Sequence, residues 1–414
     1  MSTLDPQRTV AELKELRSLT ADENGAQRVA FTDTWLRARR WLEAKLGELP
    51  VEVHTDAAGN LWATLPGERE AALLLGGHID SVPNGGWLDG CLNTLAGLEV
   101  LRRVNAAYGG KPPVTLRLVD WADEEGARFG KSLFGSSAFS GNLDMSEARG
   151  LADKDGVALP EALRARGIDF ERVLDAGQER QNAAAYLELH VEQGPVLLDL
   201  DLPLGVVLGT FGVERHEITF RGQAAHSGST PMNRRKDAFL AAARMSPEIY
   251  RITDRHGGVC TIGSCKTKPG IVTSVVEECT ITLDQRHLDA EALAKMLQEA
   301  KDASERFAEE GGVTVAWRRL WQIEPVLFDD ALIEMADEVI REACGQSHRL
   351  PSGPLHDAAE VARAGIPTVM LFVQSLHGIS HNRIEDTKEE HIELSVVALD
   401  ALAEKAMAWL RARA

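Results

Sequence analysis

The chain contains no apolar run long enough to cross a membrane, because no window reaches about 18 uninterrupted apolar residues. Its first ten residues, MSTLDPQRTV, also lack the apolar core of a secretory signal peptide. Both absences argue against a membrane-spanning protein and against a secreted one. We therefore expect a cytoplasmic protein that does not associate with membranes.

The cysteines give no sign of a disulfide framework. Five is an odd number, and no two of them are spaced as Cys-x-x-Cys. They are Cys91, Cys260, Cys265, Cys279 and Cys344. This scatter indicates neither a disulfide framework nor a thiolate zinc site.

Basic residues are too few to balance the acidic ones, since 45 Lys and Arg against 63 Asp and Glu give a net charge of -18. Such a charge argues against nucleic acid or an anionic membrane surface as a partner. An anionic small-molecule substrate would need local cations in its binding site. With 44% hydrophobic residues, the 414-residue chain is long enough for two domains or for one large core with an insert.

The alternation of short apolar runs with helical segments predicts a βαβ arrangement and a largely parallel sheet up to about residue 210. The segment Asp33–Leu46 is one such predicted helix, with its large apolar residues on one side. The stretch 141–183 is polar and helical, and we interpret it as an excursion from the sheet.

The pattern changes near Gly212. Residues 217–221, 279–286 and 313–318 alternate as strands do, and residues 236–252 and 290–309 have helical spacing. This order predicts a small α+β layer whose sheet has one solvated face. After about Glu324 the α/β pattern returns. We predict an α/β catalytic domain with a mixed, largely parallel sheet at 1–212 and 324–414, interrupted by an inserted α+β domain at 213–323.

Five side chains are candidate metal ligands, and four of them follow apolar runs. The runs 73–75, 114–119, 186–189 and 368–373 precede His78, Glu125, His190 and His381, and the fifth candidate, Asp89, lies in a Gly-rich loop. Open α/β sheets bind ligands beyond the carboxyl ends of their strands. The pattern therefore predicts one metal site at a sheet edge, with ligands suited to zinc, manganese, cobalt or nickel. Two such ions would activate water and polarise a carbonyl.

Each of these residues also has a structural interpretation. Asp80 would orient the His78 ring through a hydrogen bond, yet His78 alone is equally compatible with an exposed loop. Asp89 precedes a predicted helix, and taken alone it is more typical of a helix N-cap. His190 and His381 taken singly are more often structural than ligating. Only the combination favours the metal site.

Glu124 and Glu125 form the sharpest pair. Neighbouring side chains on an extended segment point in opposite directions, so one carboxylate would bind metal while the other acts as a general base. The alternative is an acidic surface turn. The preceding strand makes that alternative less favoured, because its end should lie at the sheet edge.

Two residues of the inserted domain are further candidates. His226 follows a strand among small residues, and it would donate a hydrogen bond to a developing oxyanion. Arg286 ends a predicted strand and would clamp a carboxylate with its guanidinium fork. From spacing alone, a loop role for His226 stays open and a surface ion pair is favoured for Arg286.

Several motifs together resemble the N-carbamoyl-L-amino-acid amidohydrolases, a group that includes β-ureidopropionases and allantoate amidohydrolases. These enzymes belong to the superfamily of dinuclear-metal aminoacylases and carboxypeptidases. The similarity runs from about Arg28 to the C-terminus. It is carried by residues 77–80, 84–90, 124–126, 189–195, 226–232 and 380–381.

The resemblance implies a role for each matched residue. His78, Asp89 and His190 would hold one divalent ion, and Asp89, Glu125 and His381 the other. Glu124 would move the proton from the attacking water to the leaving nitrogen. Gln193 and Arg286 would contact substrate, and the inserted domain would act as a lid that carries His226 across a homodimer interface.

Two positions depart from the pattern of the family. Thr273 stands where a substrate-binding Asn is common, and Leu355 stands where a Gly usually lies close to substrate. Thr273 would weaken carboxylate binding, and Leu355 would make the pocket smaller or more apolar. His356 and Asp357 follow, either as a pair that supports the site or as a buried structural pair.

The predicted function is metal-dependent hydrolysis of a linear amide C–N bond in a small ureido amino acid. The alternatives are an N-acyl amino-acid hydrolase or dipeptidase, an allantoate amidohydrolase, and a protein that binds metal or ligand without catalysis. The metal, the side-chain preference and the position of the substrate carboxylate stay open.

Overall fold

The computed structural model describes residues 4–413 and divides into two compact units. Unit 1 comprises residues up to Gly209 and from Phe328 onward, and unit 2 comprises Thr210–Leu327. The sequence placed the corresponding boundaries at 212/213 and 323/324. Among the described residues, no helix is both long and apolar enough to cross a membrane.

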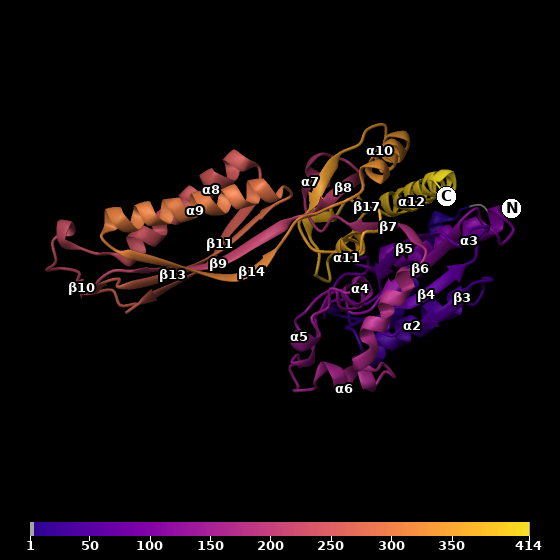
Figure 1. The fold of residues 1–414 in the computed structure, drawn as a ribbon, viewed down its shortest axis with the longest axis horizontal. Coiled ribbons are helices and arrows are strands. Elements are labelled where there is room, and N and C mark those ends of the chain that lie inside the picture. The colour runs from indigo at the N-terminus through magenta and orange to yellow at the C-terminus, as the bar shows by residue number, and fades with distance from the viewer. Residues whose placement is uncertain (1–3, 414) are drawn as a thin grey trace. The chain divides into compact units, whose positions relative to one another are not determined.

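Unit 1 is built around a mixed nine-stranded sheet in the order β15-β8-β17-β7-β5-β6-β4-β3, with β16 also paired to β8 (Figure 1). The strands of this sheet are β3 Glu52–Thr55, β4 Leu61–Leu65, β5 Ala72–His78, β6 Thr115–Trp121, β7 Ala183–Val191, β8 Leu204–Thr210, β15 Val326–Leu327, β16 Arg349–Ser352 and β17 Thr368–Val373. The edge strand β15 comprises the last two residues assigned to unit 2, at the boundary with unit 1. The central strands β17, β7, β5 and β6 are parallel, whereas β8, β4 and β3 pair antiparallel. The predicted mixed, largely parallel sheet is confirmed.

Every residue of β5 and of β17 is buried, which indicates that both faces of the central strands are covered. Helices α3, α10 and α12 pack on these strands, and α1 packs on α3 and α12. Helix α11 also packs on these strands, and α4 packs on α11. The helices of unit 1 are α1 Pro6–Thr20, α2 Asp33–Leu46, α3 Cys91–Ala107, α4 Phe134–Ser140, α5 Met145–Arg149, α6 Leu159–Arg164, η1 Phe170–Arg180, α7 Val196–Asp199, α10 Asp330–Cys344, α11 Asp357–Arg363, η3 Leu376–Gly378 and α12 Glu389–Arg413. A separate two-stranded sheet pairs β1 Ala21–Asp22 with β2 Gly25–Ala26.

Helix α2 shows how the local sequence determines an element. The Thr32 hydroxyl accepts a hydrogen bond from the Trp35 amide and caps the first turn. Trp35, Ala38, Leu42 and Leu46 then recur at helical spacing and are buried in the core. The polar stretch after residue 141 forms α5, α6 and η1 and contributes no strand to the nine-stranded sheet, as expected.

Unit 2 is an antiparallel four-stranded sheet, β11-β13-β9-β14, with α8 and α9 side by side along one face (Figure 1). Its elements are β9 Gly212–Arg221, β10 Ala225–His226, η2 Met232–Arg234, α8 Ala238–His256, β11 Val259–Lys268, β12 Ser274–Val275, β13 Glu278–His287, α9 Ala290–Gly311 and β14 Thr314–Ile323. Buried and half-buried residues alternate along β13, as in a sheet with one covered face.

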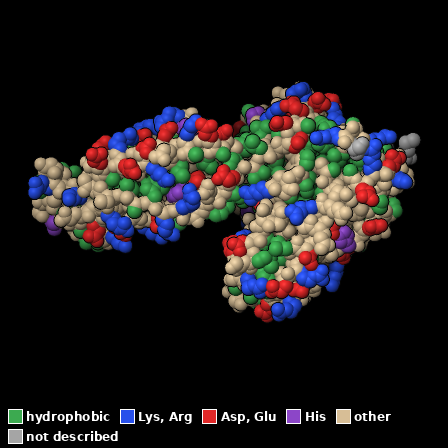
Figure 2. Space-filling model, viewed as in Figure 1, with side chains coloured by type: hydrophobic (Ala, Val, Ile, Leu, Met, Phe, Trp, Pro, Cys, Tyr) green, Lys and Arg blue, Asp and Glu red, His purple; other side chains and the backbone are tan. Residues whose placement is uncertain are grey.

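Charge is dispersed on both units. Figure 2 shows acidic and basic side chains interspersed on the face of each unit that it presents. On this face, the basic residues do not form the continuous stripe that binds nucleic acid.

Candidate metal centre

The candidate ligands gather at the carboxyl edge of the parallel strands of unit 1. His78 is the last residue of β5, and His190 is the second-last residue of β7. The loop with Glu124 and Glu125 follows β6 directly, and His381 follows β17 after η3. Parallel strands end at the same edge of a sheet, which explains why residues far apart in the chain meet there.

Two groups of side chains have the composition and spacing of metal sites. His78, Asp89 and His190 form one, and Asp89, Glu125 and His381 form the other, with the ligand atoms of each group within 4.8 Å of one another. Asp89 Oδ1 lies 3.2 Å from His190 Nε2, and its Oδ2 lies 3.4 Å from His381 Nε2. Asp89 therefore directs one carboxylate oxygen to each group, the geometry needed to bridge two cations.

The histidine tautomers fit metal binding. His78 Nδ1 lies 3.2 Å from the Asp80 carbonyl oxygen, and His190 Nδ1 lies 2.8 Å from that of Val191. A carbonyl oxygen only accepts, so the ring proton of each neutral histidine is placed on Nδ1 and the lone pair on Nε2. His78 Nε2 is buried and has no hydrogen-bond partner among the described residues. A cation would satisfy this atom.

The electrostatics of the cluster also fit cations. Burial, followed by the charge of neighbouring carboxylates, raises the pKa of Glu124 and Glu125 well above the usual range and that of Asp80 to about 7. Burial lowers the pKa of His78 to about 3, so its ring is neutral. Buried carboxylates together with imidazole ligands suit divalent ions of borderline softness.

Asp89 does not cap helix α3. The N-cap position is Gly90, and the cap has no side-chain hydrogen bond, so the N-cap interpretation of Asp89 is wrong. Gly90 has φ +67°, and a Cβ there would lie 2.3 Å from the His78 carbonyl oxygen. The backbone passes so close to His78 that a side chain at this position would clash with it.

The loop after β6 differs from the extended segment that we expected. Residues 122–125 are bent, and Asp123 has φ +57°. The two neighbouring side chains still reach different histidines, because Glu124 Oε2 lies 3.6 Å from His78 Nε2 and Glu125 Oε2 lies 3.2 Å from His381 Nε2. The Asp80 carboxylate accepts hydrogen bonds from the backbone amides of both glutamates. Asp80 thus orients His78 through its carbonyl and the loop through its side chain.

Gln193 also lies in the cluster. Its Nε2 donates to Asp89 Oδ2 at 2.9 Å, a contact with a candidate ligand that the sequence did not predict. Leu355 is half-buried in the loop between β16 and α11. The adjacent His356 is buried, its Nε2 lies 2.9 Å from the Ser352 hydroxyl, and its ring centre lies 4.3 Å from that of His190.

The remaining three predicted site residues lie in unit 2. His226 is exposed, and its Nδ1 accepts hydrogen bonds from the backbone amides of Gly228 and Ser229, each at 3.1 Å. Thr273 is also exposed. It lies close to His226, because the residue that follows it, Ser274, pairs with His226 between β10 and β12. Arg286 forms an ion pair with Asp284 at 2.8 Å.

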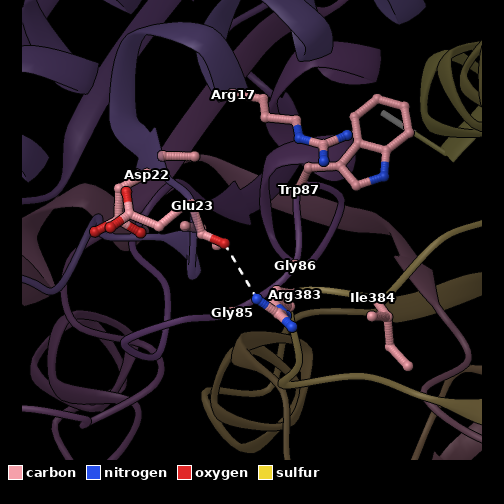
Figure 3. Close-up of a pocket in the computed structure, with 11 residues that line it drawn as sticks. Arg17, Asp22, Glu23, Gly85, Gly86, Trp87, Arg383 and Ile384 are labelled. Carbon is pink, nitrogen blue, oxygen red and sulfur yellow. Dashed lines mark hydrogen bonds between the residues drawn. The ribbon is translucent and has the colours of Figure 1, made fainter.

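Sequence reasoning did not single out Glu385 and gave Ser380 no role. Glu385 is buried and contacts both Ser380 and the backbone that leads into Asp89. The available signal was the position of Glu385, four residues after His381. The loops that carry these residues also line a hollow of about 360 Å³, to which Gly85, Gly86, Trp87, Arg383 and Ile384 contribute (Figure 3).

Comparison with known proteins places these residues in context. Residues 74–405 match the peptidase family M20/M25/M40. The chain is 36% identical over 370 residues to an N-carbamoyl-L-amino acid amidohydrolase of Geobacillus stearothermophilus. The aligned residues cover 88% of this chain and 90% of that protein. It is 31% identical over 399 residues to an allantoate amidohydrolase of Escherichia coli, covering 95% and 96% of the two chains.

The fold is also shared with solved structures. A crystal structure of an amidase of the hydantoinase/carbamoylase family from Burkholderia multivorans superposes with a TM-score of 0.87 at 32% identity, covering 98% of each chain. Similarity therefore extends over nearly the whole chain. The protein belongs to the peptidase family M20/M25/M40 and is an amidohydrolase related to its N-carbamoyl-L-amino-acid and allantoate hydrolases.

Proposed function

We propose that this protein hydrolyses the ureido group of a small N-carbamoyl amino acid, using two divalent ions and Glu124 as general base. The observation that carries the proposal is the pair of ligand groups that share Asp89, with Glu124 beside them and outside both. Zinc, manganese, cobalt and nickel all suit this donor set. Ions held there would supply Lewis acidity to the substrate carbonyl and to the attacking water.

The proposed role of Glu124 follows from its environment. Its carboxylate is buried, it lies outside the two ligand groups, and its backbone amide is held by Asp80. A carboxylate in this position accepts the proton of the attacking water and returns it to the leaving nitrogen. The products of a ureido substrate are the free amine, ammonia and carbon dioxide.

The tautomer of His226 supports its role as a donor. Because Nδ1 accepts two backbone hydrogen bonds, the ring proton of the neutral imidazole is placed on Nε2. An exposed Nε2–H is the kind of group that stabilises a developing oxyanion. We propose that His226 does so for the tetrahedral intermediate, within a homodimer in which unit 2 acts as lid and dimerisation domain. Exposed apolar residues on α8, Phe239, Leu240 and Tyr250, are compatible with such an interface.

We assign substrate contacts to Gln193, Arg286, Thr273 and Leu355. Arg286 provides the cation that an anionic substrate needs on a chain of net charge -18. It would have to share its guanidinium between the substrate carboxylate and Asp284. Thr273 has a shorter side chain than Asn, and Leu355 is bulkier than Gly. The substrate range should therefore differ from that of relatives with Asn and Gly at these positions.

A panel of substrates tests the proposal. The protein, loaded with manganese, cobalt or zinc, is incubated with N-carbamoyl-L-amino acids, β-ureidopropionate, allantoate and N-acyl amino acids, and ammonia and free amine are measured. We expect both products from a ureido compound. Amine without ammonia, from N-acyl compounds only, would identify an aminoacylase. Hydrolysis of allantoate alone would favour the activity named for the relative from Escherichia coli. No release despite two bound ions would favour the non-catalytic alternative.

A further inference from the structure

Glu385 connects two loops of the candidate metal centre. Its side chain is buried, and Oε1 accepts hydrogen bonds from the backbone amides of Leu88 at 3.1 Å and Asp89 at 3.0 Å. These amides belong to the loop that delivers Asp89, whereas Glu385 belongs to the loop that delivers His381. The two loops are nearly 300 residues apart in the chain.

A second contact extends from Glu385 to the Asp89 side chain. The Ser380 hydroxyl lies 3.0 Å from Asp89 Oδ2 and within hydrogen-bonding distance of Glu385 Oε2. The Ser380 hydroxyl has one proton, which it donates to one of the two carboxylates at a time. Ser380 therefore contacts the Asp89 carboxylate, while Glu385 accepts from the Asp89 backbone amide. Trp87 Nε1 donates to Asp386 Oδ1 at 3.2 Å and joins the same two loops again.

The packing leaves Glu385 little freedom. A Cβ at Gly86 would lie 2.1 Å from Glu385 Oε1, so only glycine allows the backbone to approach this carboxylate. Figure 3 shows a neighbouring pocket that residues of the same two loops line, among them Gly85, Gly86, Arg383 and Ile384.

This carboxylate has no direct ion pair among residues 4–413, although it interacts with the charge of a protonated His381. Within residues 4–413, Glu385 forms no ion pair with Lys, Arg or His, and its partners are two backbone amides and one hydroxyl. Burying a carboxylate that has no direct ion pair is costly, which argues that the position requires this side chain for more than packing.

We propose that Glu385, acting through Ser380 and through the Asp89 backbone, is the positioning residue that fixes the bridging carboxylate between the two ligand groups. The inference rests on the proposed function only in taking Asp89 as a ligand to both ions. Hydrogen-bond partners behind metal ligands typically contribute 10–100-fold to metal affinity or activity.

Replacement of Glu385 tests the hydrogen-bond scheme. In Glu385→Gln, the side-chain carbonyl oxygen can accept from the backbone amides of Leu88 and Asp89. The side-chain NH2 group can donate to the Ser380 hydroxyl oxygen, and the Ser380 hydroxyl proton is then free to bond Asp89. In Glu385→Ala, both connections are lost. We expect about 10–100-fold weaker cobalt binding in Glu385→Ala, with a changed visible spectrum of the bound cobalt. In Glu385→Gln, we expect cobalt affinity and spectrum close to those of the wild type. Ser380→Ala should weaken cobalt binding less than Glu385→Ala, because the backbone contact remains.

A matched control is Glu360→Ala. Glu360 is another buried glutamate, which accepts hydrogen bonds from Ser140 and Asn142 outside both ligand groups. Its removal should lower the melting temperature without changing cobalt affinity or the cobalt spectrum. Circular dichroism of the metal-free variants separates a loss of fold from a loss of metal binding.

The measurements are cobalt stoichiometry and affinity by calorimetry and the visible absorption of the bound ion, made on the full-length protein. Unchanged cobalt affinity and spectrum in Glu385→Ala would overturn the proposal, as would equal losses in Glu385→Gln and Glu385→Ala. If Glu385→Ala does not fold, unchanged cobalt binding in Ser380→Ala would overturn it instead. Wild-type protein that binds two cobalt ions but hydrolyses no member of the substrate panel would contradict the proposed function and leave this positioning role intact.

Discussion

His78 Nδ1 lies 3.2 Å from the main-chain carbonyl oxygen of Asp80, and this contact sets the tautomer of the histidine. The sequence predicted that the Asp80 carboxylate would do so, but Nδ1 is farther from Oδ1, at 3.7 Å. The carboxylate instead accepts from the amides of Glu124 and Glu125. Asp80 thus connects the orientation of one candidate ligand to the position of the candidate base.

Asp89→Ala should cause the largest loss of metal, because Asp89 is shared by both ligand groups. We expect two ions per wild-type chain, fewer than one in Asp89→Ala, and about one in His190→Ala or His381→Ala. Inductively coupled plasma mass spectrometry after desalting measures these values. His54→Ala, which removes a pair with Glu179 away from the ligand groups, is the control. Two ions retained by Asp89→Ala would exclude its bridging role.

Glu124→Gln should retain both ions and lose turnover by about 10²–10⁴-fold, because the amide keeps the shape but cannot accept the proton of water. The comparison requires kcat and metal content from the same preparation. Substantial activity in the metal-loaded variant would remove Glu124 from the role of base. Loss of metal together with activity would make it a ligand instead.

His226→Ala should lower kcat by about 10²–10³-fold with metal content unchanged, if its Nε2–H stabilises an oxyanion. His256→Ala is a suitable control, since His256 belongs to the same unit and pairs with Glu299. An unchanged kcat in His226→Ala would exclude it from the mechanism. Light scattering of both variants shows whether the expected homodimer is retained.

Metal uptake at pH 7 should release protons. Burial lowers the pKa of His190, but the hydrogen bond and charge of Asp89 outweigh it and raise the pKa to about 9; hydrogen bonding to Asp89 likewise raises that of His381 to about 9. In the metal-free protein both rings are therefore protonated at pH 7, whereas a bound cation requires the neutral ring. Apparent affinity should rise with pH up to about 9. Calorimetry in buffers of different ionisation enthalpy measures the protons released, and a value of zero at pH 7 would contradict this account.

Local signals predicted some elements accurately. The apolar spacing placed a helix at Asp33–Leu46, and α2 has these bounds. Strand β11 was not located, because its run Val259–Lys268 contains a glycine, has a register irregularity after Ile262 and is largely exposed. Its position in the sheet depends on pairing with β13, which no local pattern encodes.

Local patterns also predicted part of the candidate site. Apolar runs followed by His or Glu mark strand ends, and the structure brings the four side chains selected in this way together with Asp89 from the Gly-rich loop. The bend at Asp123 and the contacts of Gln193 and Glu385 with the Asp89 loop depend on tertiary packing between distant segments. Sequence spacing does not contain that information.

The most direct test of the proposed function follows ammonia and free amine together in one reaction, with an N-carbamoyl-L-amino acid and matched wild-type and Glu124→Gln protein loaded with the same metal. The account predicts equal amounts of ammonia and amine from the wild type and almost none from Glu124→Gln. Amine without ammonia, or comparable rates from the two proteins, would contradict it.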